Sequence, residues 1–203
     1  VPYEDGEEGR TYLLPPADAV IDPKQEDCNY PFKGLCGAAV AYKLVEALFE
    51  AMGRDVEDVD YLMENVAIAT VGDVMDLVGE NRIFVKQGLE MLKRTNNLGL
   101  KALIECTGVD KERLSAYHIG FIIGPCLNAS GRLDTAKRAL ELLSARTRKE
   151  ADVLAGDLKA LNQNLQNILD ESKYWKEKIM SQKGRSFLGH LICFKRVDFF
   201  QNL

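Results

Sequence analysis

Apolar side chains recur every three to four residues over a long stretch of the second half of the chain. The stretch runs from about residue 148 to residue 180, and its leucine and isoleucine positions are Leu154, Leu158, Leu161, Leu165 and Ile168. This alternating spacing places the side chains on one side of an α-helix. The sequence therefore predicts one helix over residues 148–180, which we expect to pack on neighbouring elements and to connect two domains.

Shorter helices are predicted upstream. Over residues 37–52, Val40, Leu44 and Leu48 lie four apart, and Gly53 supplies a stop. Similar patterns predict further helices near residues 56–78, 80–94, 99–107, 110–117 and 135–144. The chain is therefore expected to be predominantly helical with a few short strands.

Three segments are expected to be non-helical. Residues 1–17 are polar with three prolines and are predicted to form a loop. Residues 18–22 form a short apolar run closed by Pro23, which favours a buried strand. Residues 118–132 contain three glycines and a proline, so we expect turns around a short apolar stretch.

The charge balance argues against a chain that binds nucleic acid over its whole surface. The formal net charge of the 203 residues is −5, whereas such proteins are usually basic. Only the segment 125–149 is locally basic, and its cations are Arg132, Lys137, Arg138, Arg146, Arg148 and Lys149. A solvated helix face and a local binding patch both remain open interpretations.

Cysteine usage indicates a reducing compartment. The five cysteines form no CxxC pair and the two histidines lie far apart, so a zinc site has no support. We expect inert thiols in a cytoplasmic protein. No apolar run approaches the roughly 18 residues that span a bilayer. Since the chain begins at Val1, without an initiator methionine or a signal peptide, we expect that its true beginning is missing.

Asp73 is the most suggestive single residue because it interrupts the apolar run 66–75. A carboxylate in such a run costs several kcal/mol to bury unless it is paired or binds a cation. Carboxylate oxygens are the ligands that Mg²⁺ and Mn²⁺ prefer in phosphodiester hydrolysis. An aspartate tied to a helix end or to Arg82 is the alternative that residue chemistry alone leaves open.

A second constellation lies in residues 124–132. Small residues there allow backbone groups to approach an anion, while Asn128 or Ser130 can donate to a phosphate oxygen and Arg132 can grip it with two N–H groups. A structural turn that caps the following helix explains the same residues. The segment therefore predicts either a phosphate site or a helix start.

Six short segments of the sequence resemble the RecJ family, the bacterial single-strand-specific DNA exonucleases of the DHH phosphoesterase superfamily. They occur in the family's order, and the resemblance covers roughly residues 14–170. The segments are LPPADA (14–19), DPKQ (22–25), YPFKGLCGAAVAYKL (30–44), ATVGDV (69–74), LVGENR (77–82) and IGPCLNASGRLD (123–134).

The resemblance implies roles for four residues. Asp73 falls on the aspartate of the family's fourth catalytic motif, a ligand of a Mn²⁺ or Mg²⁺ pair. Asn128, Ser130 and Arg132 fall on the family's Asn-Ala-Ser motif, which is implied in holding DNA phosphate. The resemblance also implies an α/β parent fold, of which this chain would be a mostly helical part.

The sequence also departs from the family pattern at several places. The family's first three metal motifs, including Asp-His-His, do not occur here and would lie upstream of Val1; its glycine-rich substrate motif is also absent. Leu165 stands where family members often carry arginine. We therefore expect residues 1–146 to be the C-terminal part of a catalytic domain and 147–180 an interdomain helix. Residues 181–203 match nothing, and we expect them either to begin a second domain or to reflect an altered reading frame.

The resemblance implies a fragment of a 5′→3′ single-stranded DNA exonuclease for DNA repair and recombination, inactive alone because one carboxylate cannot hold two cations. Single-stranded DNA is its implied partner, with single-strand-binding protein and a helicase as further partners and no membrane. Two alternatives stay open. One is a related phosphodiesterase acting on short oligonucleotides or cyclic dinucleotides, and the other is a non-catalytic helical binding module.

Overall fold

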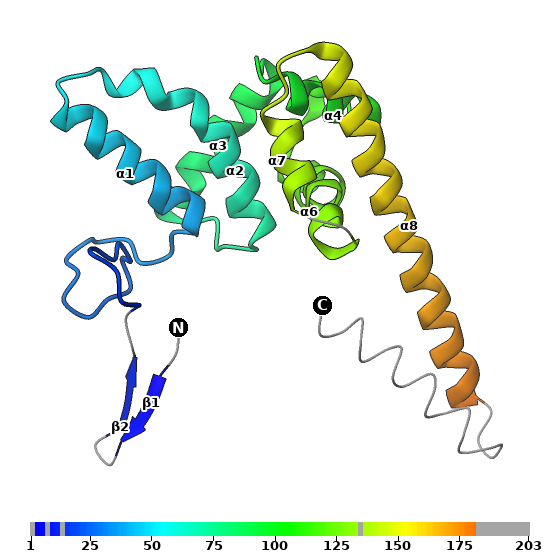
Figure 1. Ribbon diagram of the computed structural model, residues 1–203, viewed down its shortest axis with the longest axis horizontal. Helices are drawn as coiled ribbons and strands as arrows, with labels where there is room; N and C mark the ends of the chain where they lie inside the picture. Colours follow the sequence, from blue (N-terminus) through cyan, green and yellow to red (C-terminus); the bar gives the residue numbers. More distant parts are fainter. Residues whose placement is uncertain (1–2, 7–8, 13–14, 134–135, 182–203) are drawn as a thin grey trace.

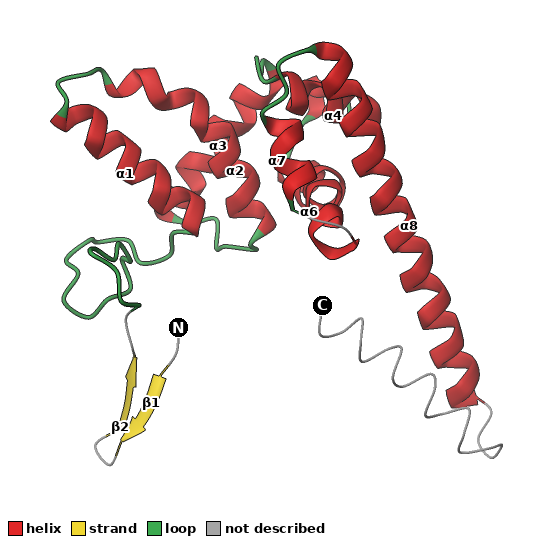
Figure 2. Cartoon of the chain, in the orientation of Figure 1, coloured by secondary structure: helices red, strands yellow, loops and turns green. Residues whose placement is uncertain are grey.

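A β-hairpin followed by a series of helices makes up the described part of the chain (Figures 1 and 2). The computed structural model describes residues 3–6, 9–12, 15–133 and 136–181, with side chains for 15–131 and 136–174. Its elements are β1 (Tyr3–Gly6), β2 (Gly9–Tyr12), α1 (Gly37–Ala51), η1 (Val56–Leu62), α2 (Met63–Gly72), α3 (Gly79–Lys93), α4 (Leu98–Thr107), η2 (Lys111–Arg113), α5 (Ala116–His118), η3 (Ile119–Ile123), α6 (Gly124–Leu133), α7 (Lys137–Leu143) and α8 (Arg148–Ser181). The prediction of a mostly helical chain with a few short strands is confirmed.

The long helix predicted from the apolar spacing is confirmed as α8, which runs along one side of the molecule (Figure 1). It packs on α4, α6 and α7. Leu158 and Leu165 of the predicted series are buried, and Leu154 and Leu161 are half-buried against the same core. The connection between two domains stays a prediction, as do the domain limits at residues 147 and 181, and residues 182–203 lie outside the described residues.

Two hydrophobic clusters meet at α2. One joins α1, η1, α2 and α3 and includes Met63 and Val66, while the other joins α4, α6, α7 and α8 and receives Ile68. Helix α3 approaches α2 closely because Gly88 has no side chain, and a Cβ atom there would overlap Ala67. Since both faces of α2 are packed, the position of its C-terminal end is fixed by the whole helical body.

The predicted helix 37–52 is confirmed as α1, but the expected apolar stripe is wrong. Ala39 and Tyr42 are buried, whereas Leu44 and Leu48 are 41% and 50% exposed. The Tyr42 ring meets the Phe84 ring edge-on with 5.8 Å between centroids, and its hydroxyl donates a 3.1 Å hydrogen bond to Asp60. The inner face of α1 therefore holds Tyr42, whose ring is packed and whose hydroxyl is hydrogen-bonded there. Leu44 and Leu48 lie on the outer face of the helix.

Two expectations for the first 22 residues are wrong. Residues 1–17 include the antiparallel hairpin β1–β2, with Tyr3 opposite Tyr12, rather than loop alone. Residues 18–22 form no strand, and Ile21 is 57% exposed. The Asp22 carboxylate accepts a 2.9 Å hydrogen bond from the Lys24 backbone, so the segment turns at Pro23 and pairs with no strand among the described residues.

The turns expected over residues 118–132 are also wrong, because the chain is helical from α5 through η3 to α6. The middle part, η3, is a π-helical turn directly before Gly124 and Pro125. A π turn is wider than an α turn and fits a proline that cannot donate the usual hydrogen bond. Gly124 also lies against the Ile119 carbonyl, where a Cβ would come within 2.8 Å. The glycines are therefore packing positions in a helix.

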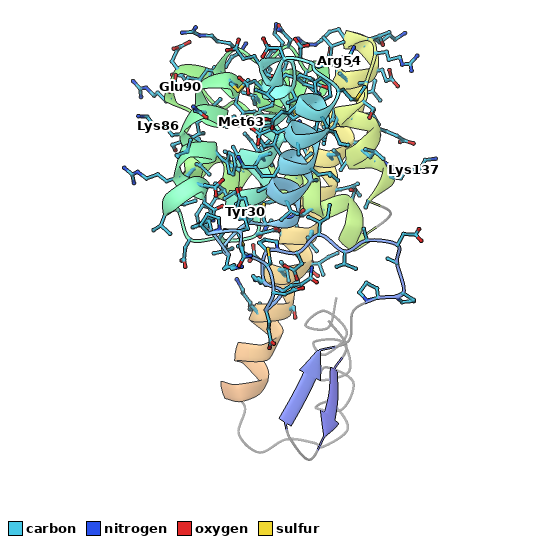
Figure 3. All side chains as sticks on the ribbon, turned by 90° about the vertical axis from the view of Figure 1, so that its left-hand side faces the viewer. Tyr30, Arg54, Met63, Lys86, Glu90 and Lys137 are labelled. Carbon is cyan, nitrogen blue, oxygen red and sulfur yellow. The ribbon has the colours of Figure 1, made fainter. Side chains whose placement is uncertain are left out.

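Ion pairs account for three of the six cations in the locally basic segment. Arg148 contacts Glu105 at 2.6 Å and Asp152 at 2.7 Å, Arg138 contacts Asp157, and Lys137 contacts Glu141. Figure 3 shows Lys137 and Lys86 pointing outward from opposite sides of the helical body. Lys137, Arg138 and Arg148 therefore belong to a paired, solvated helix surface. Among the described helices, none is apolar over a stretch long enough to cross a membrane.

Candidate metal and nucleic-acid site

Asp73 lies at the C-terminal end of α2 and not inside it. The helix ends at Gly72, and the Asp73 backbone N–H donates the last α-helical hydrogen bond, 2.8 Å to the Ala69 carbonyl. The Asp73 side chain is exposed. The expectation of a carboxylate embedded in an apolar helix is therefore wrong, because the helix predicted over 56–78 consists of η1 and α2 and stops before the acid.

A Schellman motif ends α2. Val74 N–H donates to the Val71 carbonyl and Met75 N–H to the Thr70 carbonyl, both at 3.1 Å. The motif requires a left-handed residue at the position of Val74, which has φ 55° and is 88% exposed. Glycine is usual there, and a β-branched residue is strained. Val74 therefore keeps the backbone beside Asp73 in a costly conformation, a feature that clusters at functional sites.

The strain at Val74 gives the first testable expectation. Val74→Gly should raise the free energy of unfolding by about 1 kcal/mol, because glycine adopts the left-handed conformation without a Cβ penalty. Thermal unfolding followed by circular dichroism measures the gain. Val153→Gly is the matched control, since Val153 is an exposed valine inside α8 and glycine in a helix interior should only lower stability. A Val74→Gly protein less stable than the parent would contradict the strain.

The Asp73 carboxylate has no hydrogen-bond or ion-pair partner among the described side chains. The alternative expectation, an ion pair between Asp73 and Arg82, is therefore wrong. The C-terminal end of a helix carries partial negative charge, so a carboxylate there is unfavourable unless a cation is near. Asp73 thus fits as one ligand of a divalent cation. No group of three or more potential ligands occurs in the part of the chain that the structure describes, so a metal pair would need further ligands from elsewhere.

A cleft of about 260 Å³ lies beside this helix end, where α2, the helix η3–α6 and α8 come together. Three glycines and a proline line it, namely Gly72, Gly120, Gly124 and Pro125. The remaining lining residues are three amides and two leucines, namely Asn128, Asn162, Gln166, Leu165 and Leu169. We call this the glycine cleft. It brings Gly72, the neighbour of Asp73, together with the predicted substrate residue Asn128.

The three residues expected to hold phosphate differ in placement. Asn128 is exposed and lines the glycine cleft. Ser130 is fully buried, and its hydroxyl donates to the Leu127 carbonyl at 3.3 Å, so its side chain packs within α6. Arg132 belongs to α6, but its side chain lies outside the described residues. Asn128 is therefore the member of the motif that the structure places beside Asp73's helix end.

Cys126 is buried in α6 near Asn162, which lines the glycine cleft. Burial raises the pKa of the Cys126 thiol to about 11, an effect that a hydrogen bond with Asn162 partly offsets. The thiol is therefore protonated at neutral pH and is no nucleophile. The amide oxygen of Asn162 is buried and accepts no hydrogen bond from the described part of the chain. The apolar spacing of α8 gave no sign of this residue.

A network behind the site fixes the loop that follows Asp73. The Asn81 amide, fully buried, donates 2.8 Å to the Gly34 carbonyl and 3.0 Å to the Asp76 carbonyl. Phe32 lies against Gly79, where a Cβ would come within 2.9 Å of the ring. The loop after Asp73 is thus supported by residues 30–36 and 77–82. In the sequence these residues stood out only because they lie in segments that resemble the RecJ family.

Comparisons with known proteins point to one family of exonucleases. No family model matches the chain. The chain is 38% identical over 171 residues to the single-stranded-DNA-specific exonuclease RecJ of Bacillus subtilis, which covers 84% of this chain and 21% of that protein. It is 39% identical over 165 residues to the RecJ of Escherichia coli, which covers 76% of this chain and 29% of that protein. The chain thus spans less than a third of the length of these relatives.

A solved structure gives the same result. The RecJ of Thermus thermophilus in complex with Mn²⁺ matches with a TM-score of 0.65 and 32% identity, over 78% of this chain and 23% of that one. The same protein has also been solved with Mg²⁺. The helical arrangement described above is therefore that of one section of a RecJ structure, and the expected fold is confirmed.

Proposed function

Because this chain is homologous to one section of the RecJ family of single-stranded-DNA-specific exonucleases, we propose that it is part of a metal-dependent enzyme that degrades single-stranded DNA from its 5′ end. The observation that carries the proposal is the exposed Asp73 carboxylate at the negative end of α2, which has no ion-pair partner among the described residues. A carboxylate at the negative end of a helix is stabilised when a cation binds to it.

In this proposal Asp73 holds one divalent cation, and the packed end of α2 fixes its position. Mn²⁺ or Mg²⁺ would polarise the scissile phosphate and lower the pKa of the attacking water. Asn128, exposed on α6, donates a hydrogen bond to the DNA backbone and orients the strand. Arg132 adds a charge-assisted contact to phosphate.

The biological setting belongs to the same proposal. A cytoplasmic enzyme of DNA repair and recombination would receive single strands from a helicase and from single-strand-binding protein. The relatives' names support single-stranded DNA as the substrate class.

A chimera tests the proposal. In it, the matched section of the Bacillus subtilis RecJ is replaced by the corresponding residues of this chain. We expect the chimera to release nucleotides from single-stranded DNA in the presence of Mn²⁺, while the 203-residue chain by itself releases none, because one carboxylate cannot hold a metal pair.

The controls separate folding from chemistry. A deletion of the matched section without replacement should be inactive, and circular dichroism and gel filtration should show the chimera folded and soluble. A folded chimera without manganese-dependent nuclease activity, or robust activity of the isolated chain, would contradict the proposal.

A further inference from the structure

Two exposed aromatic rings lie stacked on the helix that α5 and η3 form. The ring centroids of Tyr117 and Phe121 are 4.9 Å apart, and their planes differ by 27°. The two residues are 62% and 71% exposed. Among the described residues, Phe121 has no ring neighbour other than Tyr117. Phe121 therefore rests on Tyr117 and leaves much of its ring open to a further planar group. We call this pair the aromatic ledge.

The core does not account for the aromatic ledge. The inner side of the same helix is supplied by Ile119 and Ile123, which are both fully buried. Two large rings left together in solvent forgo the free energy that burial would give them, and such patches mark interaction sites. Phe121 also belongs to the π turn η3, and turns of this kind occur frequently at functional sites.

The aromatic ledge is attached to the helix end that carries the proposed metal ligand. Phe121 directly follows Gly120, and Asp73 directly follows Gly72, and both glycines line the glycine cleft. Gly120 also packs on α2, where a Cβ atom would come within 3.4 Å of the Val71 side chain. A strand whose phosphate lies at Asp73 therefore has the aromatic ledge close by.

The charge and shape of this segment suit a DNA strand. Residues 113–133 contain no aspartate or glutamate, although the chain has 31 acidic residues and a net charge of −5. The segment therefore adds no negative side chain that would repel phosphates. A flat ring with an open face is matched best by another flat ring, and every base has such a face, whatever its sequence.

We propose that the aromatic ledge stacks with one unpaired base of the DNA strand, with Phe121 contacting the base and Tyr117 supporting Phe121. This inference rests on the proposed function for the identity of the strand. A base inside a duplex has both faces covered by its neighbours, whereas a base in a single strand can turn one face to the ledge. The stacked base holds the adjoining backbone near Asp73.

Nuclear magnetic resonance of the 203-residue chain tests the aromatic ledge directly. A short single strand of deoxyadenosine nucleotides should shift the ring-proton signals of Tyr117 and Phe121 upfield, because a stacked base adds its ring current. An abasic strand of the same length, which carries the same sugar-phosphate backbone, should leave these signals in place. Equal shifts from the abasic strand, or none from the deoxyadenosine strand, would overturn the inference.

Substitutions at Phe121 separate a ring face from mere apolar contact. Phe121→Leu should weaken binding of the deoxyadenosine strand about tenfold, since leucine is apolar but has no ring. Phe121→Trp should bind at least as tightly as the parent chain, because its larger ring keeps the face. Tyr61→Leu is the matched control, since Tyr61 is a 63% exposed tyrosine of η1 outside the ledge. Equal binding by Phe121→Leu and Tyr61→Leu would contradict the role of Phe121.

The same variants distinguish a base from a protein segment in the Bacillus subtilis chimera. A segment packed tightly on the ledge would tolerate leucine but not the larger tryptophan, so Phe121→Trp alone would lower the Tm of the chimera. We expect both variants to keep the Tm within about 2 °C of the parent chimera, because Phe121 is exposed. A lower Tm confined to Phe121→Trp would overturn the inference.

The outcome is independent of the nuclease assay. An active chimera, together with no ring shifts from the deoxyadenosine strand, would remove the stacking site and leave the proposed function standing. Ring shifts at Phe121 together with a folded but inactive chimera would do the reverse.

Discussion

Replacing Asp73 by alanine in the Bacillus subtilis chimera should lower manganese-dependent release of nucleotides about 10³-fold, because metal stabilisation of the reacting phosphate supplies several kcal/mol. The fold should survive, since the side chain is exposed and has no partner among the described residues. Removal of a carboxylate from the negative end of α2 should even raise stability slightly, by about 0.5 kcal/mol. Initial rates on a 5′-labelled single strand and a thermal melt give both numbers.

Asp76→Ala is the matched control, because Asp76 is also an exposed aspartate in the loop after α2 and only its backbone carbonyl is used by Asn81. We expect this variant to keep its rate within about twofold, which corresponds to less than about 0.5 kcal/mol in the barrier. Equal losses in the two variants would mean that the loop tolerates no change, and near-normal turnover of Asp73→Ala would remove Asp73 from the reaction.

Gly99→Ala should destabilise the chain by about 3 kcal/mol or more, the largest effect of any single methyl group that we expect here. Gly99 lies in the first turn of α4, and a Cβ atom there would overlap the backbone carbonyl of Leu142 at the end of α7. A backbone oxygen cannot rotate away as a side chain can, so α4 and α7 must separate. Both helices belong to the core that supports α8. A fall in Tm of about 10 °C is expected.

Gly156→Ala provides the opposite control on the outer side of α8. Gly156 is an exposed residue of α8, and a Cβ there meets nothing within 4 Å. Alanine should therefore stabilise the helix by about 0.5–1 kcal/mol. If both substitutions destabilised the chain equally, the clash between α4 and α7 would not be the cause.

Regular apolar spacing predicted the helix that packs on the core along one stripe. Helix α8 begins at residue 148 as expected, and Leu154, Leu158 and Leu161 face the core that α4 and α6 share with it. Spacing failed where a local backbone feature decided the result. The π turn before Pro125 keeps residues 116–133 helical despite their glycines, and the hydroxyl of Tyr42 selects the inner face of α1 against Leu44.

The candidate site was predictable in its residue types and not in its geometry. Asp73 stands out as an acid in an apolar run, but its exposure depends on Val74, a residue whose left-handed conformation nothing in its type suggests. Asn162 lies between heptad positions and has the character of an ordinary polar residue of α8. Only the crossing of α8 over η3 and α6 turns it toward the glycine cleft.

Metal exchange at position 73 tests the central claim most directly. In the chimera carrying Asp73→Cys, a thiolate replaces the carboxylate, and thiolates bind soft cations in preference to Mg²⁺. If Asp73 holds the catalytic cation, Cd²⁺ should restore at least about tenfold more activity than Mg²⁺ does, whereas the chimera with Asp73 intact should show no such preference. Equal rates of the Asp73→Cys chimera in Cd²⁺ and Mg²⁺ would contradict the claim that this side chain binds the metal.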